Sequence, residues 1–164
     1  MGSTAKLKAV GLFLGACSIL PWRVEALTVT VTNTSDNGVG TLRTAIDDVN
    51  LTGDSTNAIL FDFTGVPPYT INITSALAAI TVPVLIDGAS QTNFGGLVPA
   101  VVVDGGTNAM DGFVIRATAC TVRALSIRNF GFSGIRLESN NNVVARNFIT
   151  DNGTGVTVLA SGNL

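Results

Sequence analysis

The sequence predicts an all-β protein whose short strands stack as a solenoid, and three observations lead to this fold class. Short strand-like runs, bounded by clusters of Gly, Pro, Asn and Asp, fill most of the chain after residue 26. A single segment has the apolar spacing of a helix. In the last third, a glycine followed by an apolar run recurs at nearly constant spacing, at positions 112, 134 and 155, and periods of this length are typical of stacked structural units.

Residues 1–26 have the layout of a secretory signal peptide. Residues 1–8 carry two lysines and no acid, residues 9–20 are uncharged and apolar, and Val24 and Ala26 place small residues at the −3 and −1 positions of a cleavage site. A spanning helix needs about 20 apolar residues, so this run is too short. Alternatively, the segment ending at Cys17 resembles a lipobox, and Cys17 would then be lipidated. Either route predicts a secreted or outer-surface protein without a transmembrane span in its mature part.

Composition after residue 26 excludes several functions. Six of the nine basic residues and ten of the eleven acidic residues remain, a net charge of −4, so a basic surface for nucleic acid is not expected. Histidine is absent from the sequence, which excludes Ser-His-Asp and Cys-His nucleophile systems from residues 1–164. Cys120 is the one cysteine left, and it lies beside Val122–Ile127, predicted to be one buried strand. We therefore expect an unreactive, buried thiol and no intrachain disulfide.

The first elements follow from local patterns. Residues Leu27–Thr32 alternate as a half-buried strand does. Thr41–Asn50 is predicted to be a helix with Thr41 as its N-cap, because four apolar residues fall on one face: Leu42, Ala45, Ile46 and Val49. No helical run separates the strands that follow, which argues against a βαβ sheet. These strands are expected near Ala58–Phe63, Tyr69–Thr74, Val82–Ile86 and Val101–Val103.

The C-terminal repeat is the most informative pattern. Gly112, Gly134 and Gly155 each precede a short strand. A second set repeats at a step of 22, in which Val122, Leu125, Ile127 and Asn129 correspond to Val144, Asn147, Ile149 and Asp151. Two or three strands per repeat, each bonded to the next repeat at about 4.8 Å, would stack equivalent residues on one another. A β-sandwich is the alternative, but it requires no fixed step with matching inward residues.

Several segments resemble bacterial surface proteins that contain a so-called CSLREAI segment. Residues 33–46 (NTSDNGVGTLRTAI) resemble that segment, with Thr41 where its name has Cys-Ser and Thr44 in place of Glu. The same proteins are matched in order further along, in a resemblance that spans about residues 28–155: Tyr69–Ile73, Leu77–Ile80, Val84–Gly88 and Thr121–Asn129.

The resemblance implies a right-handed parallel β-helix of pectin-lyase-like shape. Residues 27–57 would form an N-terminal strand and a capping helix, and residues 58–164 would form coils of about 22 residues each. Solenoids need end caps for solubility, and the helix suits the first coil. The last coil lacks a comparable cap, so we expect downstream coils of the same polypeptide to cover it.

Acidic residues give the one candidate metal site. Asp87, Asp104 and Asp111 each precede glycine, and in pectate-lyase-like β-helices such acids hold calcium with arginine as the base. The alternative is that Asp-Gly forms a turn at the end of a strand. Because the turn interpretation is sufficient, we assign no catalytic, cofactor-binding or metal-binding residue and expect no cofactor.

Other polar and aromatic residues could contact glycans, although solvated surface positions are the favoured interpretation of the arginines. Arginine binds carboxylates in bidentate fashion, and five arginines lie in the repeats: Arg116, Arg123, Arg128, Arg136 and Arg146. Arg116 and Glu138 are one repeat apart, which predicts a surface ion pair. Asn140–Asn142 and Asn152 are expected at corners as turn residues, with glycan hydroxyls as the alternative partner. Among aromatic residues that could contact a sugar, Tyr69 is the sole tyrosine, and partial exposure is expected of Phe94, Phe130 and Phe132.

These observations favour a non-catalytic, secreted or cell-surface module, a stalk or adhesin that contacts polysaccharide or cell-surface glycan. The alternative is the N-terminal part of a polysaccharide lyase, glycoside hydrolase or epimerase whose active site lies beyond residue 164. The fold class does not decide between them, because function resides in sites placed on a fold.

Overall fold

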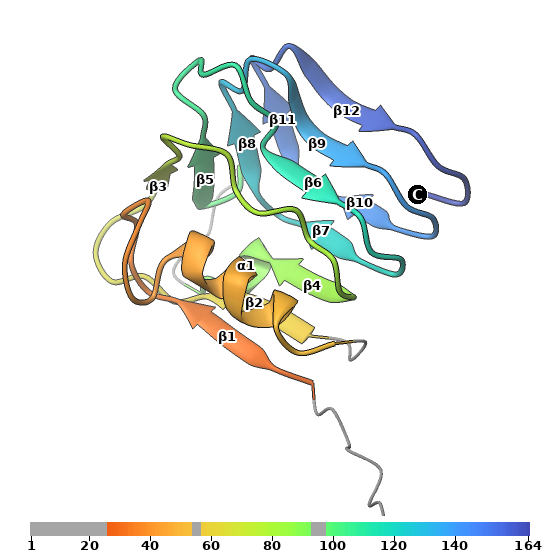
Figure 1. Cartoon of the computed structure of the whole chain (residues 1–164). Coiled ribbons are helices and arrows are strands. Elements are labelled where there is room, and N and C mark those ends of the chain that lie inside the picture. The colour runs from red at the N-terminus through yellow and green to blue at the C-terminus, as the bar shows by residue number, and fades with distance from the viewer. Residues whose placement is uncertain (1–25, 54–56, 93–97) are drawn as a thin grey trace, which may run out of the picture.

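The computed structural model describes residues 26–53, 57–92 and 98–164. Within them, twelve strands form three sheets, with one α-helix, α1 (Leu42–Asn50), and a 3-10 turn, η1 (Gly88–Ser90) (Figure 1). Residues 1–25 of the predicted signal peptide, which include Cys17, lie outside the described residues. Sheet A contains, in spatial order, β1 (Thr28–Val31), β2 (Asn57–Phe61), β4 (Val84–Asp87), β7 (Thr121–Arg123) and β10 (Val143–Ala145). Sheet B contains β3 (Tyr69–Asn72), β5 (Val101–Asp104), β8 (Ser126–Arg128) and β11 (Phe148–Thr150), and sheet C contains β6 (Phe113–Ile115), β9 (Ser133–Leu137) and β12 (Thr154–Val158).

All neighbouring strands within these sheets are parallel. Because the described residues form twelve strands and a single α-helix, the predicted all-β class is confirmed. From β7 onward the chain enters sheets A, B and C in turn. Thr121 pairs with Val143 and Ile135 with Val156, which confirms the repeat step predicted for the C-terminal third. Earlier steps are longer, as in Leu85 with Thr121, because loops without a repeat lie between the strands. The predicted step of 22 residues therefore describes only the C-terminal part.

The prediction of a single strand over Val122–Ile127 is wrong. The segment divides into β7 and β8, which belong to different sheets. Ala124 lies between them with φ at 55°, in the left-handed region that turns the chain sharply. Left-handed residues recur at the same corners one step later: Ala119 with Asn141, Ala124 with Arg146, and Asn129 with Asp151. The sequence repeat predicts the equivalence of the last of these pairs.

A left-handed alanine is strained, which leads to a stability prediction. Ala119 is exposed, with φ at 58°. We expect Ala119→Gly to raise the free energy of unfolding by about 0.5–1 kcal/mol, because glycine adopts this backbone conformation without strain. Ala78 is also exposed but is not among the residues with positive φ. Ala78→Gly should therefore lower stability, and urea unfolding of both variants checks the opposite signs. A loss of stability in Ala119→Gly would contradict the strain argument.

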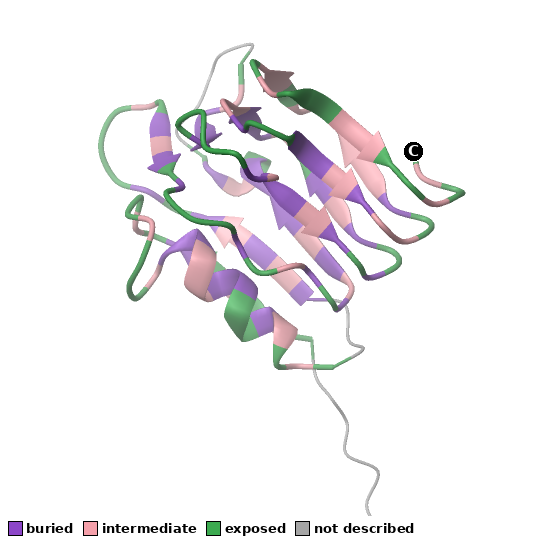
Figure 2. Cartoon of the chain, turned by 45° about the horizontal axis from the view of Figure 1, so that its top comes forward, coloured by how far each residue is buried: buried purple, intermediate pink, exposed green. Residues whose placement is uncertain are grey.

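One hydrophobic core is enclosed by the three sheets and α1. Equivalent residues stack across strands, such as Ile86 on Val122 in sheet A and Val103 on Ile127 in sheet B, and all four are at most 1% exposed. Figure 2 shows buried segments in successive strands of the stack. Cys120 belongs to this core, as predicted, and burial raises the pKa of its thiol.

The predicted helix is confirmed as α1. Thr41 is its N-cap, with Oγ1 accepting a hydrogen bond from the Thr44 backbone N–H at 3.3 Å. The four buried residues of the helix are those predicted from the spacing. This face packs on β1 and β2, so α1 covers one end of the stack, opposite β10–β12 (Figure 1). Apolar side chains at that end are thereby removed from water.

Candidate functional site

Sheet B carries two outward rows of side chains that the register brings together. Val103, Ile127 and the residues that pair with them across the strands point into the core. Successive residues of one strand point to opposite faces of the sheet. The residues between them therefore face outward. One row is Thr70, Val102, Ser126 and Phe148, and the next is Asn72, Asp104, Arg128 and Thr150.

A groove lies over these rows. Its volume is about 310 Å³, and it is lined by Pro67, Pro68, Val98, Pro99, Val102, Ser126, Arg128, Phe148 and Thr150. Phe148 is 49% exposed, and the Arg128 side chain is 42% exposed. The described lining residues include one cation and no carboxylate. We name this hollow the sheet B groove.

Arg128 is held by one edge of its guanidinium group. Its Nε donates to Asp104 Oδ2 at 2.8 Å. Asp104 also accepts from Asn129 Nδ2, at 3.0 and 3.1 Å, and from the Gly106 backbone N–H. Within the described residues, Nη1 and Nη2 of Arg128 make no hydrogen bond, so this edge is available to an anionic ligand. Burial alone would raise the pKa of Asp104, but these hydrogen bonds and the charge of Arg128 together lower it, so the carboxylate stays ionised.

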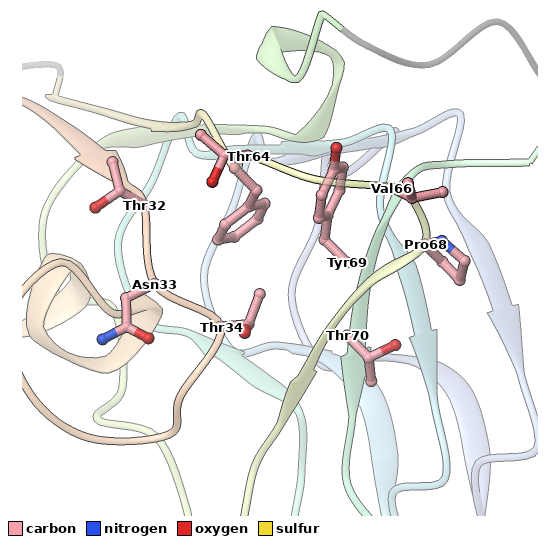
Figure 3. A pocket seen from close by; sticks show the side chains of 9 residues that line it. Thr32, Asn33, Thr34, Thr64, Val66, Pro68, Tyr69 and Thr70 are labelled. Atoms are coloured by element: carbon pink, nitrogen blue, oxygen red, sulfur yellow. The ribbon is translucent and has the colours of Figure 1, made fainter.

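A second hollow adjoins the first at Pro68, which lines both. Figure 3 shows its lining side chains, and its volume is about 360 Å³. Tyr69 donates its hydroxyl to the Gly65 carbonyl at 2.9 Å and is only 5% exposed, so little of its ring is available for stacking. The lining is uncharged and rich in threonine, comprising Thr32, Asn33, Thr34, Phe63, Thr64, Val66, Pro68, Tyr69 and Thr70.

The three candidate calcium ligands do not converge. Asp87 accepts from Arg123 Nε at 2.9 Å and Nη2 at 2.6 Å, and Asp104 is bound to Arg128. Asp111 accepts from the Ser133 backbone N–H at 2.8 Å and lies 3.9 Å from Arg136. Across residues 26–53, 57–92 and 98–164, no group of three His, Cys, Asp or Glu residues has a metal-site arrangement.

The Asp-Gly turn interpretation is confirmed at two of these positions. Asp87 accepts from the Ala89 backbone N–H at 3.0 Å, and Asp104 accepts from the Gly106 N–H at 2.9 Å. Each aspartate thus closes its own turn while its carboxylate pairs with an arginine on the neighbouring strand. The hydrogen bond from Arg123 is the main cause of a lowered pKa at Asp87, and it outweighs the effect of burial.

These pKa shifts predict acid lability. The pKa values of Asp36, Asp87 and Asp104 all lie below the ordinary value of 3.8 in the folded protein. A lowered folded-state pKa gives stability that is present above the unfolded value and is lost as pH falls through the folded value. We expect the free energy of unfolding to decrease as pH falls from 4 to 2, measured by urea unfolding. Asp87→Asn should flatten this decrease, and an unchanged slope would contradict the assignment.

The remaining arginines form surface ion pairs or stand alone. Arg116 Nε donates to Glu138 Oε2 at 2.8 Å, as predicted from their spacing. Arg136 donates to the same carboxylate at 2.7 Å. Arg146 makes no ion pair with any described residue. Arg128 alone among the five candidates lines the sheet B groove.

Asparagines at the corners bridge successive passes of the chain. The Oδ1 atoms of Asn142, Asn147 and Asn152 accept from backbone N–H groups of the preceding pass, at 2.8 to 3.0 Å. Asn141 has φ at 58°. The turn interpretation holds for Asn141 by its backbone and for Asn142, whose Nδ2 donates to the Ser139 carbonyl at 2.9 Å. The side-chain hydrogen bonds of Asn140 and Asn152 instead join one pass to another.

The aromatic predictions were only partly right. Phe132 is 55% exposed, as expected, but Phe130 is 1% exposed, so its predicted exposure is wrong. Its ring fills the space that Gly105 and Gly112 leave, because a Cβ on either glycine would lie within 3.0 Å of it. Phe94 lies outside the described residues. Phe148 was missed, although its place beside Ile149, the equivalent of inward Ile127, indicated an outward side chain.

Comparison of the chain with protein-family models, with curated proteins and with solved structures gave no match. In the described part of the chain, no helix has the length and apolar character needed to cross a membrane. Fold and site therefore define a protein of parallel β-sheets with a surface groove that combines one arginine, one exposed phenylalanine and several prolines.

Proposed function

We propose that this chain is a right-handed parallel β-helix module that is exported from the cell and binds acidic polysaccharide in the sheet B groove without cleaving it. The observation that carries the proposal is the groove itself, which is lined both by the half-exposed Phe148 and by Arg128, whose Nη1 and Nη2 make no hydrogen bond to a described residue. The resemblance to bacterial surface β-helix proteins and the layout of residues 1–26 support export.

The β-helix part of the proposal rests on the order in which the chain enters the sheets. From β4 onward, the three consecutive strands of each pass lie in sheets A, B and C, and each following pass adds one parallel strand to each sheet. Left-handed residues at equivalent corners turn the last two passes in the same way. A continuous winding around one core accounts for both features, with α1 as the N-terminal cap.

The glycan part rests on the chemistry of the groove. A sugar ring presents an apolar face and hydroxyl edges, and Phe148 with Pro68 and Pro99 offers an apolar surface to such a face. Nη1 and Nη2 of Arg128 are positioned for a uronate carboxylate, which arginine binds in bidentate geometry. Thr150 adds a hydroxyl group on the same face, whereas Ser126, which also lines the groove, is only 4% exposed.

A binding role is favoured over catalysis because the groove has no acid or base pair. Hydrolysis of glycosides uses two carboxyl groups that flank the scissile bond, whereas the described lining residues contain none. Asp104, the nearest carboxylate on this face, is bound to Arg128 and Asn129. Polysaccharide cleavage is the alternative function, and the test below distinguishes it from binding.

Isothermal titration with oligogalacturonates and with uncharged cello-oligosaccharides tests the proposal. We expect binding of the acidic oligomer, and Phe148→Ala should weaken it about tenfold, because aromatic anchors carry much of the affinity of a binding site. Arg128→Gln should weaken binding of the acidic oligomer alone. Matched controls are Phe132→Ala and Arg116→Gln, both exposed and outside the groove.

Two results would overturn the proposal. Equal loss of affinity in the control variants would remove the groove as the binding site. Release of shortened or unsaturated sugars during the titration, detected by mass spectrometry, would replace the binding role with the enzymatic alternative.

A further inference from the structure

Two Asn-Gly dipeptides in the chain differ in their surroundings. Asn37-Gly38 lies in the loop between β1 and α1, and both of its residues are exposed. Asn152-Gly153 lies at the corner between β11 and β12. An asparagine followed by glycine is prone to spontaneous deamidation, because glycine has no side chain to shield the backbone nitrogen that attacks the asparagine amide.

The reacting groups of Asn37-Gly38 are accessible. The Gly38 N–H makes no hydrogen bond with a described residue. The space around Gly38 is open, since a Cβ placed there would have no atom within 4 Å. The side-chain amide of Asn37 has one contact with a described residue, from Nδ2 to Asp36 Oδ2 at 3.4 Å, which is longer than an ordinary hydrogen bond. Neither the nucleophile nor the carbon that it attacks is therefore held away from the other.

Asn152-Gly153 has the opposite arrangement. Asn152 Oδ1 accepts from the Phe130 backbone N–H at 2.9 Å, and Nδ2 donates to the Ile127 carbonyl at 3.1 Å. The Gly153 N–H donates to the Phe130 carbonyl at 2.9 Å. A Cβ at Gly153 would lie 2.3 Å from the Gly131 carbonyl oxygen, so this corner is closely packed. Both reacting groups are bonded elsewhere, and a reaction here first requires local unfolding.

We propose that Asn37 is a site of spontaneous deamidation to isoaspartate in the folded protein, and that Asn152 is protected from it. The Gly38 backbone nitrogen bonds to Cγ of Asn37 and gives up its proton. The bond from Cγ to Nδ2 breaks, and Nδ2 leaves with that proton as ammonia. A water molecule then opens the resulting succinimide ring. Opening at the backbone carbonyl of Asn37 gives isoaspartate, in which the chain runs through Cγ, and opening at Cγ gives aspartate.

Isoaspartate at position 37 weakens the attachment of α1. It adds one methylene to the backbone directly before Gly38, whose carbonyl accepts from Thr41 Oγ1 at 2.9 Å and from Thr44 Oγ1 at 2.7 Å. Thr41 is the N-cap of α1. On the other side of the reacting dipeptide, Asp36 pairs with Arg43 of α1. The added methylene changes the spacing between these two anchoring points, so α1 is held less firmly over its end of the stack.

Incubation of the folded protein at mildly alkaline pH, followed by peptide mass spectrometry, tests the modification site. We expect isoaspartate and aspartate at position 37, with deamidation of Asn152 at least about tenfold slower, because Asn152 reacts only after local opening. In urea, where both dipeptides are unfolded, the two rates should become similar. Asn37→Gln is the matched control, since it keeps the amide but would have to form a larger, less favourable ring.

Thermal unfolding of the incubated protein tests the effect on α1. We expect its midpoint to lie about 2–4 °C below that of fresh protein, as for the loss of an N-cap interaction in a chain of this size. Asn37→Asp carries the new charge without the additional methylene, so it should unfold with fresh protein. Incubated Asn37→Gln should keep its original midpoint.

Each part of the inference has outcomes that overturn it. Equal rates at Asn37 and Asn152 in the folded protein, or deamidation of Asn37 only in urea, would exclude the selective exposure of Asn37. An unchanged midpoint for the protein that contains isoaspartate, or an equal loss in Asn37→Asp, would exclude the effect of the longer backbone on α1.

Discussion

Gly88→Ala is expected to lower the free energy of unfolding by about 3 kcal/mol, the upper part of the usual range for overpacking. A Cβ at Gly88 would lie 2.0 Å from the Ala124 carbonyl oxygen and 2.7 Å from Leu125 Cδ2. Both neighbours are fixed, because the Ala124 N–H donates to the Ala145 carbonyl and Leu125 is fully buried. The added methyl group must therefore separate β4 from the corner between β7 and β8. Urea unfolding monitored by circular dichroism measures the loss.

Gly155→Ala is the matched control for this variant. Gly155 belongs to the glycine repeat, but its nearest contact for a Cβ is 3.7 Å away. Gly112 and Gly134 lack this space, since a Cβ on each would approach the next glycine's carbonyl oxygen to 2.4 and 3.0 Å. We expect a change within about 1 kcal/mol for Gly155→Ala. Equal losses for Gly88→Ala and Gly155→Ala would contradict the explanation that close approach between passes selects glycine.

Arg43→Ala is expected to lower the free energy of unfolding by about 2 kcal/mol, because the Asp36 carboxylate loses its charged donor and keeps only uncharged ones such as Thr74. Arg43 Nη2 donates to Asp36 Oδ1 at 2.6 Å and to the Ser75 carbonyl at 2.7 Å, and Nη1 donates to the Ala76 carbonyl at 2.8 Å. The side chains of Arg43 and Asp36 are only 16% and 9% exposed. This contact joins α1 to the segment that follows β3.

Arg116→Ala provides the comparison for Arg43→Ala. The Arg116 side chain is 59% exposed in its pair with Glu138, and such surface pairs contribute about 0–1 kcal/mol. Thermal unfolding should therefore show a larger loss of stability for Arg43→Ala than for Arg116→Ala. A second test uses pH, since burial raises the pKa of Asp36 while hydrogen bonds from Thr74 and Arg43 lower it overall. Without Arg43 the pKa should rise, and an unchanged titration would contradict the role of Arg43.

Local chemistry allowed several features to be predicted from the sequence. The apolar stripe of α1 follows from the helical period of about 3.6 residues, which four apolar positions suffice to display. The ion pair of Arg116 with Glu138 follows from a register step that the glycines mark. In both cases the necessary information lies within one helix or two successive repeats.

Other features depend on contacts that no short segment contains. The corner at Ala124 could not be predicted, because alanine does not favour a left-handed backbone and only the two flanking sheets require it there. The sheet B groove combines Pro67, Val98, Arg128 and Phe148 from four separate segments. Its assembly needs the register of β3, β5, β8 and β11, and the first of these steps does not follow the C-terminal repeat.

Titration of the ¹⁵N-labelled protein with an oligogalacturonate, followed by amide chemical shifts, tests the central claim most directly. The proposed site predicts that Val102, Ser126, Arg128 and Phe148 shift together, because sheet B places them in two adjacent rows beneath one ligand. Amides of sheet C, on the face that carries Arg116, should remain unchanged. Shifts confined to sheet C, or no shifts at millimolar ligand, would contradict the assignment of the sheet B groove as a glycan-binding site.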